Sequence, residues 1–239
     1  MPEAGAPTAS SLHERAVDEL GSKIVTGEIT AGTVLTSESL GISRSVLRES
    51  IRVLEALGLV GARRRMGTTV LPETSWHMLD PRVIAWRLSG PDRLRQLGYL
   101  SELRSAVEPV AARLASRRAT PEQCGELTAA IIGMVTTRRS ADDEQYLAHD
   151  RDFHRILLES SGNPAFAALS GVVAEALTGR TVHALMPHTA NPRALELHEQ
   201  VVTCVRSGDG DGAERAMRAI VTEADAAVQQ IAASSDTPA

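Results

Sequence analysis

The N-terminal region alternates between helical and strand-like patterns of apolar residues. Apolar positions recur every three to four residues over 12–24 and again over 46–57, which predicts two amphipathic helices. Ser43 precedes the second of these stretches, where its side chain can cap the helix, and Gly58 follows its end. Residues 59–62 and 68–71 have the pattern of two short strands.

A shorter helical segment is predicted near Ser37, followed by a tight turn at Gly41. The resulting order is helix, helix, turn, helix and hairpin, which is typical of a winged helix-turn-helix. We therefore predict such a domain over residues 11–72, behind a disordered segment at 1–10.

The remainder of the chain is almost entirely helical in pattern. Prolines and glycines mark the breaks, and Thr120 with Gln123 has the form of a capping box. The predicted helices span residues 93–117, 121–138, 142–161, 164–186, 191–206 and 210–232. Short loops between them predict an antiparallel all-α bundle over 93–232, so the fold class is mostly α. A connector at 73–92 carries both tryptophans, and a disordered tail is expected at 233–239.

Composition places further limits on the class of protein. Aromatic residues make up only 3% of the chain, which favours helices packed through aliphatic side chains. The two cysteines have no metal-ligand spacing, and there is no signal peptide or membrane-length apolar stretch, so we expect a cytoplasmic protein. The formal net charge is −5, yet residues 1–72 hold eight basic and eight acidic side chains and are neutral.

Basic residues gather on the predicted third helix and on the hairpin turn. An isolated arginine is more often a solvated charge than a ligand, but six in this arrangement favour contact with DNA bases and phosphates. The predicted DNA-binding residues are Ser43, Arg44, Ser45, Arg48, Arg52, Arg63, Arg64, Arg65 and Gly67.

Two stretches carry a resemblance to a known family. Residues 41–60, GISRSVLRESIRVLEALGLV, followed by RMGTTV at 65–70, resemble the DNA-binding domain of GntR-family regulators. Residues 102–115, ELRSAVEPVAARLA, and the SGNP sequence at 161–164 are similar to the helical FCD effector domain of the FadR-type branch. The connector sequence at 79–86, LDPRVIAW, is similar to that of sugar-acid-responsive members, the D-galactonate repressors among them.

The sequence departs from the family pattern in the first helix of the helix-turn-helix. Only Thr36, Ser37, Glu38, Ser39 and Leu40 stand where the family has a full helix. Contacts that the family makes from that helix therefore have no counterpart that can be assigned here.

Asp150 and His154 lie four residues apart and share one face of a predicted helix. This spacing suits two ligands of a metal ion, and His198 could complete the set from a later helix. Spacing alone favours a hydrogen-bonded pair in a metal-free pocket. The family resemblance instead implies an Asp and up to three His that hold a divalent cation such as zinc or nickel. The family's last histidine falls at Ile220, so that ligand is absent.

Two arginines are candidate ligands for an effector. The resemblance implies that Arg104 binds a carboxylate of the effector, where a guanidinium can donate two parallel hydrogen bonds. The alternative is an internal salt bridge from Arg104 to Glu108, one turn later. Arg180 is a further candidate on a helix whose inward face is not defined by the sequence.

These features predict a homodimeric DNA-binding transcriptional regulator, a repressor whose affinity for operator DNA is controlled by a small carboxylate, of the sugar-acid class, in the helical domain. The rival hypothesis is a metal-dependent enzyme built on the bundle. That hypothesis leaves residues 11–72 without a role, and no general base stands in a recognisable motif.

Overall fold

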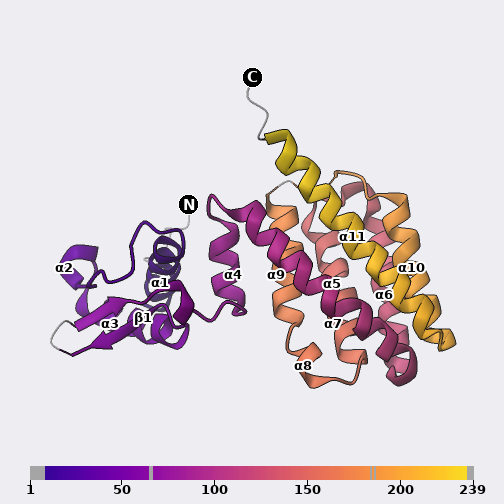
Figure 1. The fold of residues 1–239 in the computed structure, drawn as a ribbon, viewed down its shortest axis with the longest axis horizontal. Coiled ribbons are helices and arrows are strands. Elements are labelled where there is room, and N and C mark those ends of the chain that lie inside the picture. The colour runs from indigo at the N-terminus through magenta and orange to yellow at the C-terminus, as the bar shows by residue number, and fades with distance from the viewer. Residues whose placement is uncertain (1–8, 65–66, 184, 186, 236–239) are drawn as a thin grey trace, which may run out of the picture. The chain divides into compact units, whose positions relative to one another are not determined.

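The computed structural model describes residues 9–64, 67–183, 185 and 187–235, with side chains from residue 13 to residue 230. It divides into two compact units, one reaching Arg93 and the other starting at Leu94. Both are shown in Figure 1, and each is described by itself. None of the helices in the described ranges has the length and apolar character needed to cross a lipid bilayer.

The N-terminal unit is a winged helix-turn-helix, as the sequence predicts. Its elements are α1 (Ala9–Val25), α2 (Ser37–Leu40), α3 (Arg44–Ala56), β1 (Val60–Arg63), β2 (Gly67–Val70), the 3-10 turn η1 (Glu73–Ser75) and α4 (Pro81–Leu88). The strands pair in antiparallel register, with Val60 opposite Val70 and Arg63 opposite Gly67. Ser43 caps α3 by accepting a hydrogen bond from the backbone of Val46, as expected.

The second helix is a single turn, which confirms that the chain is short at this point. Thr36 and Ser39 form a capping box around it, and Gly41 ends it with a φ of 63° in the left-handed region. The truncated helix is therefore a closed, capped turn.

The connector is a packed part of the N-terminal unit. Both Trp76 and Trp86 belong to its hydrophobic cluster, around fully buried residues such as Leu54 and Leu59. The Trp86 ring lies so close to Gly21 on α1 that a Cβ there would stand 2.4 Å from the ring. Gly21 therefore lets α4 pack tightly against α1.

The C-terminal unit is an all-α bundle (Figure 1). Its elements are α5 (Arg93–Arg118), α6 (Pro121–Thr137), the 3-10 turn η2 (Arg138–Ser140), α7 (Glu144–Ser160), α8 (Pro164–Ala167), α9 (Ser170–Val182), α10 (Pro192–Ser207) and α11 (Gly210–Ser235). Helix α7 packs against α6 and α9, while α10 packs against α6 and α11. Phe153 on α7 is fully buried in the main core cluster, together with Met134, Leu157 and Met217.

Three predicted boundaries differ from the structure. The helix expected over 164–186 is two helices, α8 and α9, because Ala168 and Leu169 form a turn between them. Helix α1 already begins at Ala9, inside the segment predicted as disordered, and α11 continues to Ser235. The expectations for residues 1–8 and 236–239 lie outside the described residues.

Candidate functional site

The arginines predicted to contact DNA lie on the surface of the N-terminal unit. All of the predicted contact residues that the structure describes are exposed: Ser43, Arg44, Ser45, Arg48, Arg52, Arg63, Arg64 and Gly67. Arg65 lies outside the described residues. The nearest opposing charge is Glu49, whose carboxylate is 3.1 Å from Arg52 and 3.7 Å from Arg48. Such exposed pairs exchange readily for other partners.

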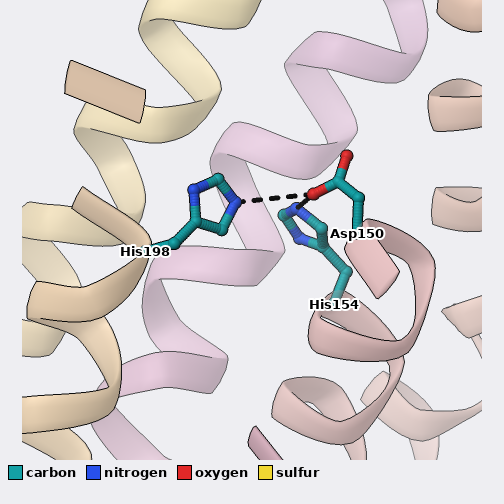
Figure 2. A group of neighbouring side chains, drawn as sticks. All are labelled: Asp150, His154 and His198. Carbon is teal, nitrogen blue, oxygen red and sulfur yellow. Dashed lines mark ion pairs between the residues drawn. The ribbon is translucent and has the colours of Figure 1, made fainter. Parts of the chain in front are cut away.

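In the C-terminal unit, three predicted metal ligands meet inside the bundle. Figure 2 shows Asp150 and His154 on one helix, α7, with His198 reaching toward them from α10. The Nε2 atoms of both histidines lie 3.5 Å from Oδ1 of Asp150. One ligand atom from each residue lies within 4.8 Å of the others, and all three residues are buried. The i,i+4 spacing on α7 places the first two on one face, as predicted.

Hydrogen bonds fix which nitrogen of each histidine faces the centre. Nδ1 of His198 lies 2.6 Å from the carbonyl oxygen of Ala194, which can only accept, so Nδ1 must donate. Nδ1 of His154 likewise donates to the Glu108 carboxylate. When a ring is neutral, its Nε2 therefore carries a lone pair. The Nε2 of His198 faces Asp150, and the Nε2 of His154 lies 3.5 Å from Asp150 and 3.4 Å from Nη2 of Arg104, which can donate to it.

With both rings neutral, the centre contains two buried acceptors that lack a donor. Oδ1 of Asp150 and Nε2 of His198 are buried and have no hydrogen-bond partner among the described residues. Burial raises the pKa of Asp150, but the close approach of His154 and His198, when they carry positive charge, outweighs burial and holds that pKa well below its usual range. Unpaired buried acceptors are costly, and a cation between them removes the cost. The donor set of two imidazoles and one carboxylate fits a divalent transition metal.

Glu108, the alternative salt-bridge partner of Arg104 in the sequence analysis, links Arg104 to His154. One carboxylate oxygen accepts from Nε of Arg104 at 2.5 Å, and the other accepts from His154. Burial raises the pKa of Glu108, yet the charges and hydrogen bonds of Arg104 and His154 lower it to about 2. The internal salt bridge is therefore present. A carboxylate behind a histidine also orients that ring toward a metal ion.

The two predicted effector arginines differ in their partners. Arg104 is 3% exposed and is held by Glu108, with its Nη2 3.4 Å from Nε2 of His154. Arg180 is half-buried, and its Nε has no hydrogen-bond partner among the described residues. Burial, and then the charge of Arg104, lower the pKa of Arg180. Arg180 therefore has donor capacity left for a ligand.

Both arginines and the Asp-His-His centre line one cavity of about 140 Å³. Tyr146 and Glu223 line the cavity as well, and neither residue was predicted from the sequence as part of the site. Burial and Asp150 raise the pKa of Tyr146, so it is a neutral phenol that can donate a hydrogen bond. Glu223 lies one helical turn after Ile220 on α11, so the two residues share one face of that helix. Since Ile220 replaces a family ligand at the site, this spacing was a signal in the sequence for Glu223.

Two family profiles match the chain. That of the bacterial regulatory proteins of the gntR family matches residues 12–70, and that of the FCD domain matches residues 99–223. The galactonate operon transcriptional repressor of Escherichia coli (strain K12) is 30% identical over 224 residues, which cover 91% of this chain and 97% of the relative. The repressor NanR of Cronobacter sakazakii is 29% identical, with 87% and 81% covered.

Solved structures share the fold. Escherichia coli McbR/YncC superposes with a TM-score of 0.55 at 18% identity, over 93% of this chain and 99% of the other. Streptococcus agalactiae GntR gives a TM-score of 0.50 at 24% identity, over 90% and 99%. At these identities the similarity concerns the fold alone.

Proposed function

Because the chain belongs to the GntR family of bacterial regulatory proteins and carries an FCD domain, it is a transcriptional regulator, and we propose that it represses its operator until a small carboxylate of the sugar-acid class binds in the FCD domain. The galactonate operon repressor among its relatives supports repression as the mode of action. The domains and relatives indicate a transcription factor, which counts against the metal-dependent enzyme.

The exposed face of α3 binds the operator in this proposal. Arg44 and Arg48 stand near the N-terminal end of α3, where a recognition helix contacts base edges. Arg63 and Arg64 at the end of β1 contact phosphates or the minor groove. A homodimer presents two such helices to the two half-sites of a pseudo-palindrome.

Asp150, His154 and His198 hold a divalent cation, zinc or nickel, in this proposal. The unpaired acceptors on Asp150 and His198 support this assignment, because a cation satisfies both. When bound, the ion supplies a Lewis acid that attracts an oxygen of the effector. With Ile220 in place of the family's last histidine, the chain offers three ligands and leaves room for the effector's oxygen.

The single observation that carries the effector proposal is the cavity that Arg180 shares with this centre. A guanidinium with free donor capacity beside a cation site is complementary to a carboxylate. Arg104 approaches the same cavity but is already neutralised by Glu108. We therefore assign the main carboxylate contact to Arg180 and a supporting role to Arg104.

Thermal unfolding of metal-analysed protein with a panel of sugar acids, hydroxy acids and dicarboxylates tests the proposal. A true effector at about a hundred times its dissociation constant stabilises the folded protein by about 2.7 kcal/mol. It should also release operator DNA, and chelation should remove both effects. Acids that stabilise without releasing DNA would contradict the sensor, and turnover of an acid that stops on chelation would favour the enzyme.

A further inference from the structure

We propose that the cavity selects an acid that also carries a protonated amine, and that Glu223 on α11 binds this amine. The inference rests on the proposed function, because it concerns the same cavity and assumes that an acid occupies it. It adds a second recognition point, of opposite charge to Arg180.

Glu223 lines the cavity, and one of its two carboxylate oxygens is an unused acceptor. Its Oε2 is buried and lacks a hydrogen-bond partner within the described part of the chain. By contrast, Glu214 on the same helix is paired with Arg113 and Arg218. A buried carboxylate oxygen without a donor costs stability, so the ligand that occupies the cavity is the natural source of one.

Glu223 belongs to neither of the charged groups already described. The group of metal-ligating atoms that lie within 4.8 Å of one another consists of Asp150, His154 and His198. No ion pair between Glu223 and Arg180 is found in the described ranges, although both line the cavity. The cavity is therefore lined by an arginine with an unpaired donor, Arg180, and by a separate carboxylate with an unpaired acceptor, Glu223.

The surroundings of Glu223 strengthen its preference for a cation. Along α11, the cavity wall beside it is formed by Ile220, Ala224 and Ala227, which are apolar. These apolar neighbours cannot donate hydrogen bonds to the half-buried side chain of Glu223, and a carboxylate gains more from an ammonium group than from a hydroxyl. Charge-assisted hydrogen bonds are about twice as strong as neutral ones.

Two pairs of acids, matched except for one group, test the inference by calorimetry on the metal-loaded protein. D-glycerate and D-serine differ only by a hydroxyl and an ammonium at C2, and so do D-gluconate and 2-amino-2-deoxy-D-gluconate. We expect the amino member of at least one pair to bind about tenfold tighter or more, the range of a hydrogen bond between charged groups. Glu223→Gln keeps the shape of the side chain and should abolish this preference, while binding of the hydroxy acid stays within about threefold.

Controls separate the amine contact from metal chelation and from general charge. Metal content, measured by elemental analysis, should be equal in Glu223→Gln and the natural protein, because an amine could also bind the ion. Glu214→Gln, on the same helix but outside the cavity, should keep the tenfold preference. A preference that survives Glu223→Gln would overturn the role of Glu223.

The outcomes also distinguish this inference from the proposed function. If hydroxy acids bind the natural protein and the amino acids bind no tighter, the inference is wrong and the acid sensor stands. If none of the four probes, nor any acid in the thermal panel, binds, the acid sensor is wrong and this inference falls with it.

Discussion

Arginine serves opposite purposes in the two units. On α3, the side chains of Arg48 and Arg52 are 70% and 68% exposed and share one glutamate on the surface. In the bundle, Arg104 and Glu108 are 3% and 0% exposed and depend on each other. Water screens the exposed charges on α3, so Arg48 and Arg52 can still bind an external phosphate. Arg104 and Glu108 are buried, where an unpaired charge is strongly destabilising. The N-terminal charges are thus available for a partner, and the C-terminal charges build the site.

The largest expected effect is loss of stability when the buried network is cut. Glu108→Gln leaves Arg104 and His154 without their shared carboxylate and should destabilise the protein by about 3–5 kcal/mol in chemical denaturation. The matched surface change, Glu49→Gln, should alter the free energy of unfolding by less than about 1 kcal/mol. Equal effects of the two substitutions would contradict the view that the buried ion pairs stabilise the protein and the exposed ones do not.

The next effect concerns the proposed metal ion. Removing it with a chelator should lower the unfolding temperature, and zinc or nickel at about a hundred times its dissociation constant should restore about 2.7 kcal/mol. Asp150→Asn and His154→Ala should each reduce the bound metal measured by elemental analysis, while Glu49→Gln should not. Full metal content in both site variants would show that Asp150 and His154 do not bind the metal ion, and the unpaired acceptors in the bundle would need another explanation.

A third effect should appear in DNA binding and not in stability. Arg48→Ala should weaken binding to the operator by about 1–3 kcal/mol if Arg48 contacts a base, with an unchanged unfolding temperature. Arg82→Ala, on the exposed side of α4, is the control and should leave operator affinity unchanged. If Arg48→Ala binds the operator as tightly as the natural protein does, Arg48 does not contact the DNA.

The smallest effect concerns the single-turn helix α2. Thr36→Ala removes the side chain that accepts from the backbone of Ser39 and should cost about 1 kcal/mol of stability in chemical denaturation. Thr222→Ala, an exposed threonine on α11 that is no cap, is the control and should cost less. No loss in Thr36→Ala would mean that the capping box does not stabilise this turn.

Local pattern made much of this molecule predictable. Ser43 and Thr120 mark helix starts because their side chains bond to nearby backbone, and the spacing of Asp150 and His154 follows from the period of one helix. The resemblance to the family, rather than pattern, brought in His198 from a distant helix.

What the sequence could not provide was the partner of each buried charge. Glu108 is one turn from Arg104, so that bond could be considered, but its second bond to His154 joins two helices and depends on their packing. The free Nε of Arg180 and the free oxygen of Glu223 are likewise properties of the assembled cavity. Burial of a long polar side chain is decided by its neighbours in space.

The shared carboxylate of Glu108 has a consequence for how this chain can evolve. Because Arg104 and His154 rely on the same side chain, substitutions at these three positions are expected to be strongly non-additive. We expect a change at one position to be tolerated best with a compensating change at another, so the three should be inherited as a set. Descendants that lose the Asp150, His154 and His198 centre should therefore lose Arg104 with it, and changes in ligand preference should begin at positions outside this set, such as Glu223.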